Sequence, residues 1–69
     1  MTANKDFFDN LNRNIRNART KKTLTVLEKL ARKYVNQMTP SISVNIRNDA
    51  KKRLTLSLKL IRKIWKKLK

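Results

Sequence analysis

The fold is decided by residues 22–38, whose sequence is Lys-Thr-Leu-Thr-Val-Leu-Glu-Lys-Leu-Ala-Arg-Lys-Tyr-Val-Asn-Gln-Met. Apolar side chains recur there every three or four residues, so they line one face of an α-helix, while charged side chains take the opposite face. The apolar face contains Leu24, Leu27, Leu30, Ala31, Tyr34 and Met38, widened by Val26 and Val35. The pattern predicts an amphipathic helix over residues 22–38.

Residues on both sides mark the ends of this helix. Thr20 or Thr23 can cap its start by accepting a hydrogen bond from a free backbone N–H, and Thr25 with Glu28 offers an alternative capping box. Pro40 ends it, because proline lacks the donor that continues a helix and disfavours helical geometry in the residue before it.

Two further helices are predicted, one on each side. The first covers about residues 5–19 and has Phe7, Phe8, Leu11, Ile15 and Ala18 on one face. The last begins at a cap formed by Asn48 or Asp49 and continues to about residue 68. Its apolar face holds Leu54, Leu58, Ile61, Trp65 and Leu68, flanked by Leu56, Leu60 and Ile64.

Residues 41–47 fit two patterns. Ile42, Val44 and Ile46 alternate as in a strand, whereas Ile42, Ile46 and Ala50 keep a helical spacing. A lone strand would need a second copy of the chain to pair with, so we favour a short helix or an extended connector.

These segments predict one all-α domain over residues 1–69. We expect a small three-helix bundle, or a four-helix bundle if residues 41–47 form a helix, with a basic amphipathic C-terminal helix. The expected core is Phe8, Leu11, Ile15, Leu24, Leu27, Leu30, Tyr34, Leu54, Leu58 and Ile61. A chain of this size buries only about 60 % of its unfolded surface, so the core should be thin and a homodimer would bury more of the apolar faces.

Charge is the strongest indication of a partner. Nineteen Lys and Arg residues against four Asp and Glu give a net charge of +15. Such an excess destabilises a small folded chain through self-repulsion, and a polyanionic partner would neutralise it. The sequence therefore indicates a partner class more clearly than an activity.

The basic residues form two clusters. In the C-terminal helix, one arc opposite the apolar face collects Lys59, Arg62, Lys63, Lys66 and Lys69, with Lys67 at its border. Solvated faces usually mix charges of both signs, so this arc, which contains no acid, predicts an interaction surface. The second cluster is Arg13, Arg16, Arg19, Lys21 and Lys22.

Asparagines accompany this second cluster, and two interpretations stay open for them. Arg and Asn are side chains that can bind base edges, through guanine and adenine respectively. Frequent Asn and Lys also fit an A/T-rich genome, such as that of a low-GC bacterium or its phage.

Catalysis is not expected. The chain has no Cys, His or Gly, so it lacks thiolate and imidazole chemistry and the Gly-rich loops that bind nucleotide phosphates. We therefore expect no catalytic, cofactor-binding or metal site, and no enzyme activity.

The predicted function is non-catalytic binding of DNA or RNA through the phosphate backbone. The residues expected to bind are Arg13, Arg16, Arg19, Lys21, Lys22, Lys59, Arg62, Lys63 and Lys66. Two alternatives remain open: a cationic membrane-active protein of the leaderless bacteriocin type, and a small modulator that docks on an acidic host protein. Because the sequence has neither a long apolar run nor the apolar core of a secretory signal, we expect a cytoplasmic location.

Overall fold

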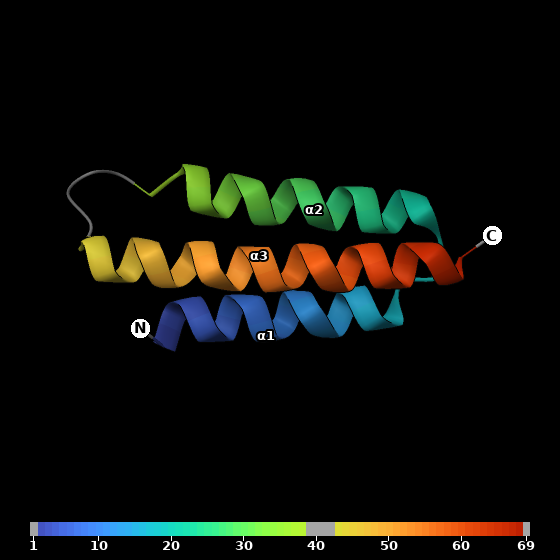
Figure 1. Ribbon diagram of the computed structural model, residues 1–69, viewed down its shortest axis with the longest axis horizontal. Coiled ribbons are helices and arrows are strands. Elements are labelled where there is room, and N and C mark those ends of the chain that lie inside the picture. The colour runs from blue at the N-terminus through green and yellow to red at the C-terminus, as the bar shows by residue number, and fades with distance from the viewer. Residues whose placement is uncertain (1, 39–42, 69) are drawn as a thin grey trace.

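The structure, a computed structural model, describes residues 2–38 and 43–68. These residues form three α-helices, α1 (Thr2–Asn17), α2 (Lys21–Asn36) and α3 (Val44–Lys67), and no strand occurs among them (Figure 1). Each helix packs against the other two. The predicted all-α three-helix bundle is confirmed.

The helix directions follow from two contacts between α1 and α3. Asn4 of α1 hydrogen-bonds near the start of α3, to Ile46, and Asn12 hydrogen-bonds farther along, to Ser57, so the two helices run parallel. Helix α2 runs the opposite way, and the bundle extends over 42 × 17 × 14 Å. The connection from α1 to α2 therefore lies at the same end of the bundle as the end of α3 (Figure 1).

The core lies along the line where the three helices meet. The buried apolar residues are Phe8, Leu11, Ile15, Leu24, Leu27, Ala31, Val35, Ala50 and Ile61. Of the other predicted core residues, Tyr34, Leu54 and Leu58 are half-buried against this cluster. The prediction for Leu30 is wrong, since it is 48 % exposed: only a narrow arc of α2, centred on Ala31, fits between two neighbouring helices.

Several helix ends differ from the predicted positions. Helix α1 begins at Thr2, and α2 ends at Asn36, ahead of Pro40, which lies outside the described residues. Thr20 is the cap of α2, because its side chain accepts a hydrogen bond from the Thr23 backbone N–H, 3.2 Å between N and Oγ1.

The start of α3 is the largest correction. The helix begins at Val44, with Ser43 in the cap position, so Asn48 and Asp49 lie inside it and cap nothing. Residues 44–47 belong to this helix, so for these residues the predictions of a strand and of a separate fourth helix are both wrong. Residues 41 and 42 lie outside the described residues.

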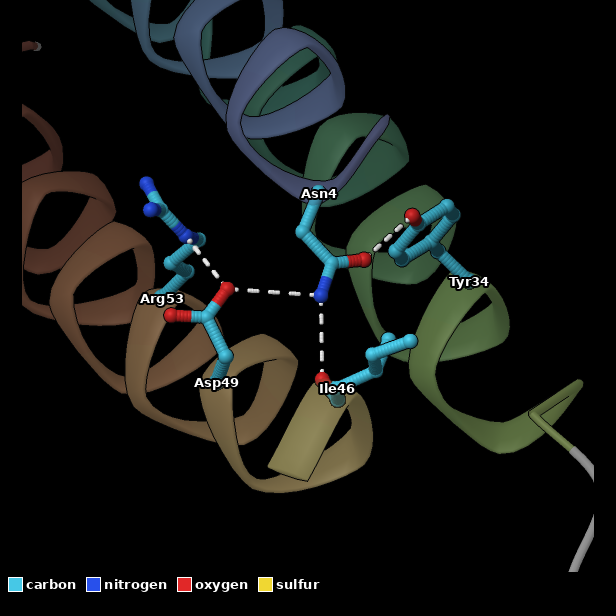
Figure 2. Close-up of polar contacts among 5 residues, drawn as sticks. All are labelled: Asn4, Tyr34, Ile46, Asp49 and Arg53. Carbon is cyan, nitrogen blue, oxygen red and sulfur yellow. Dashed lines mark hydrogen bonds and ion pairs between the residues drawn. The ribbon is translucent and has the colours of Figure 1, made fainter. Parts of the chain in front are cut away.

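A hydrogen-bonded network built on Asn4 joins the three helices at the end where α1 and α3 begin (Figure 2). The Asn4 side chain is 2 % exposed; its Nδ2 donates to the Ile46 carbonyl oxygen at 2.9 Å and to Asp49 Oδ2 at 3.3 Å. Tyr34 Oη donates to Asn4 Oδ1 at 2.6 Å, and Arg53 Nε donates to Asp49 Oδ2 at 2.9 Å. Because buried polar groups need particular partners, this network fixes α1 parallel to α3.

Aromatic side chains pack beside the network. The Phe7 ring stacks on Tyr34 with 3.9 Å between centroids, and Phe8 meets Tyr34 edge to face at 5.6 Å. Farther along, Ser57 is fully buried and its hydroxyl donates to Asn12 Oδ1 at 2.7 Å. Polar contacts thus align α1 and α3 at two points along their length.

Asp49 makes part of this network dependent on pH. The hydrogen bond from Arg53 is the largest cause that lowers the pKa of Asp49. Partial burial of the carboxyl raises this pKa, but the hydrogen bond from Asn4 and the positive charges of Arg53 and Lys52 lower it further, so the pKa is lower than usual. A lowered folded-state pKa means that the stabilisation is present above the unfolded pKa, about 3.9, and is lost as pH falls through the folded value. We expect Asp49→Asn to be less stable than the parent chain at pH 6, with the difference shrinking below about pH 4.

Urea unfolding of both chains between pH 7 and pH 3 measures this difference. Asp6→Asn, at an exposed position on α1, is the matched control for removing one acid. A stability difference for Asp49→Asn that stayed constant down to pH 3 would show that the charge of Asp49 contributes nothing to the network.

Candidate nucleic-acid interface

The bundle brings the two basic clusters of the sequence to one end. Helices α1 and α3 run parallel, and α2, which connects them in the chain, runs in the opposite direction. The end of α1, the start of α2 and the end of α3 therefore lie together (Figure 1). The Lys21 ammonium lies 5.3 Å from the centroid of the Trp65 ring, which places the start of α2 against the end of α3. We call this region the basic end; its basic residues are Arg13, Arg16, Arg19, Lys21, Lys22, Lys59, Arg62, Lys63, Lys66 and Lys67.

No acid lies within the stretches that form the basic end. Asp6 and Asp9 belong to the first half of α1, Glu28 to the middle of α2, and Asp49 to the first third of α3. Ten of the nineteen basic residues thus lie in stretches that contain no acid, and Asp9 and Glu28 are the acids that border them. The charge of the molecule is strongly asymmetric along its long axis, which concentrates positive potential at this end.

The two ion pairs found among the described residues involve none of these ten basic residues. Glu28 pairs with Arg32, 3.4 Å between Oε2 and Nε, and Asp49 pairs with Arg53 at 2.9 Å. Both pairs join neighbouring turns of one helix, a contact worth about 0.3–0.5 kcal/mol at an exposed surface. Glu28 and Asp49 are therefore paired with arginines that do not belong to the basic end.

Each predicted binding residue has a described position. Lys21 is half-buried beside Trp65, and the other eight are exposed: Arg13, Arg16, Arg19, Lys22, Lys59, Arg62, Lys63 and Lys66. Lys67 is exposed as well, while Lys69 lies outside the described residues. The structure thus places the nine predicted residues on one end of the molecule, eight of them exposed and Lys21 half-buried.

The C-terminal ends of α1 and α3 stabilise some of the basic residues at this end. Arg16 lies in the last turn of α1, and Lys66 and Lys67 lie in the last turn of α3. The C-terminal end of a helix carries partial negative charge, which stabilises a nearby cation by about 0.3–1 kcal/mol. Two such ends meet at the basic end and offset part of the repulsion there, whereas the partial positive charge at the start of α2 acts against Lys21 and Lys22.

Two hollows lie on this part of the surface. One, along α1, is lined by Asp9, Asn12, Arg13, Arg16 and Asn17, so the two arginines share a face of this helix. The other is a groove between α2 and α3 whose lining includes Arg62 and Trp65. The sequence does not predict this groove, because its two walls come from segments that are far apart in the chain. The only indication in the sequence is the position of Trp65 among basic residues of the last helix.

Within residues 2–38 and 43–68, no three acidic side chains come together in a cluster that would hold a metal ion. None of the three described helices is both long enough and apolar enough to cross a bilayer. The apolar face of α3 is instead taken up by the other helices, with Ala50 and Ile61 buried and Leu54, Leu58 and Ile64 packed against the core.

The chain matches no family model, and no curated protein or solved structure is significantly similar to it.

Proposed function

We propose that this protein is a non-catalytic nucleic-acid-binding protein that contacts the phosphate backbone with its basic end. The observation that carries the proposal is the gathering of ten basic residues, from stretches that contain no acid, at one end of a bundle only 42 Å long. Each Lys or Arg that neutralises a phosphate releases condensed counterions, so a surface of this kind gives salt-sensitive affinity largely independent of sequence.

The membrane alternative has less support from the packing. An interfacial helix must place its apolar face among the lipid chains, and that face of α3 already packs against α1 and α2. Leu56 and Trp65 are the large apolar side chains of α3's second half that stand exposed, at 62 % and 40 %. Insertion of α3 would therefore require the bundle to open.

A competition experiment tests the proposal. A fluorescently labelled 20-mer, as duplex and as single strand, is titrated with protein at 0.15 M salt, and vesicles containing anionic lipid are then added. We expect submicromolar affinity that falls steeply as salt rises, with a slope of log K against log salt near −0.9 for each phosphate engaged on duplex DNA. The oligonucleotide should stay bound when the vesicles are present.

Transfer of the protein to the vesicles would favour the membrane-active alternative. Absence of oligonucleotide binding at 0.15 M salt, without transfer to vesicles, would favour docking on an acidic protein. Either result contradicts the proposed function.

A further inference from the structure

The groove between α2 and α3 combines an aromatic ring with polar residues and with the apolar side chains of Leu58 and Ile61. Its volume is about 340 Å³, and it is lined from α2 by Thr25, Glu28 and Arg32 and from α3 by Leu58, Arg62 and Trp65. This volume is at the small end of the range for small-molecule sites, about 300–1,000 Å³. It therefore suits one small planar group better than a length of chain.

Trp65 is the residue of this groove whose exposure is not explained by packing in the core. It is the single tryptophan of the chain and 40 % exposed, whereas Ile61, one turn earlier on α3, is 4 % exposed. A large aromatic ring kept in contact with water is typical of binding surfaces. The Lys21 ammonium lies over this ring, 5.3 Å from its centroid, so the ring adjoins the positive charge of the basic end. Lys21 does not line the groove, so a base in the groove would stack on the side of the ring that Lys21 does not cover.

One side chain of the groove wall, the Glu28 carboxylate, is suited to recognising a base. Glu28 belongs to the lining, and a carboxylate repels a phosphate but accepts hydrogen bonds from the amino groups of bases. Arg32 partly balances Glu28, with 3.4 Å between Nε and Oε2. Arg62, which also lines the groove, and Lys21, which lies beside it over the Trp65 ring, are available to the phosphates on either side of such a base.

We infer that this groove binds one unpaired base of a single-stranded nucleic acid, with the Trp65 ring as the stacking surface and Lys21 and Arg62 beside the flanking phosphates. The inference rests on the proposed function and adds that the nucleic acid is single-stranded. A base in a duplex keeps both faces stacked on its neighbours, so it cannot stack on a side chain without being extruded, whereas every base of a single strand has a free face.

Trp65 fluorescence gives a direct test, because the chain has no other tryptophan. The protein is titrated at 0.15 M salt with a single-stranded 12-mer as DNA and as RNA, with the corresponding duplex, and with heparin, a polyanion without bases. Stacking of a base on indole quenches its emission. We expect strong quenching by the DNA or the RNA strand, and weak quenching by the duplex and by heparin even where they bind. A difference between the two strands identifies the preferred sugar.

Substitutions separate stacking from charge. Trp65→Leu should weaken single-strand binding by about fivefold or more with an unchanged salt slope, whereas Trp65→Phe should retain most of the affinity. Leu56→Ala is the matched control, since Leu56 is an exposed apolar residue of α3 that does not line the groove. Circular dichroism of each variant shows whether the bundle is intact, and the quenching titration of the parent chain keeps the inference testable if Trp65→Leu unfolds.

The outcomes distinguish this inference from the proposed function. If single strands bind but quench no more than heparin, or if Trp65→Leu binds like the parent chain, the base site is wrong and the phosphate-binding proposal stands. If neither single strand nor duplex binds at 0.15 M salt, both are wrong.

Discussion

Replacing Arg16, Lys22 and Lys63 with glutamine should weaken nucleic-acid binding by at least about tenfold at 0.15 M salt. The three residues come one from each helix and are exposed at the basic end. If each contacts one phosphate, their loss should reduce the magnitude of the salt slope on duplex DNA by about 2.7. Fluorescence anisotropy of a labelled 20-mer at several salt concentrations measures both quantities.

A second triple variant separates position from net charge. Lys5, Lys33 and Lys51 are also exposed, come one from each helix, and lie outside the basic end. Their replacement with glutamine removes the same three charges, so only the location differs. We expect this control to reduce affinity by a few-fold through the weaker overall field, with a nearly unchanged salt slope. Equal losses in the two triple variants would contradict a localised interface.

Asn4→Ala should be the most destabilising exchange of a polar side chain, at about 2–4 kcal/mol. It removes the donor to Ile46 and Asp49 and the acceptor for Tyr34, in a position that is 2 % exposed. Groups left without partners in a buried site each cost about 1–3 kcal/mol. A domain of this size has a total stability of about 3–10 kcal/mol, so this single change should bring it near unfolding.

Urea unfolding followed by circular dichroism measures the effect. Asn14→Ala is the control: Asn14 is exposed on the same helix, and its exchange should be neutral or slightly stabilising because alanine favours helix. Tyr34→Phe, combined with Asn4→Ala, shows whether the two side chains are coupled. Additive effects of the two changes, or a midpoint for Asn4→Ala equal to that of the parent chain, would contradict the role assigned to the network.

Periodicity was sufficient to predict the three helices, because an apolar side chain every three or four residues leaves little choice of structure. It was less informative about which part of a wide apolar face is buried. Leu30 and Val26 match the helical pattern as well as Leu27 does, yet they stand 48 % and 57 % exposed against 9 %. Only the positions of the neighbouring helices decide this, and the sequence of α2 does not contain them.

The start of α3 shows a different limit. Asn48 and Asp49 have the chemistry of helix caps, and local sequence cannot reveal that Asp49 instead meets Asn4, 45 positions earlier. Asn4 itself was missed because a buried asparagine in a polar, Asn-rich segment resembles its exposed neighbours until its partners are known.

Both basic clusters were visible in the sequence, but their position at one end was not. Residues 13–22 and 59–67 come together because α1 and α3 run parallel, a choice made by the Asn4 and Asn12 contacts rather than by the charges. The groove beside Trp65 depends on the same arrangement, since its walls come from α2 and α3.

The most direct test of the central claim is an amide chemical-shift titration of the isotope-labelled protein with a 12-mer oligonucleotide at 0.15 M salt. The basic end predicts that the largest changes fall on residues 13–22 and 59–67, with small changes over residues 31–38 and 44–52. Changes concentrated in those latter segments, or no changes at saturating oligonucleotide, would contradict the assignment of the basic end as a nucleic-acid interface.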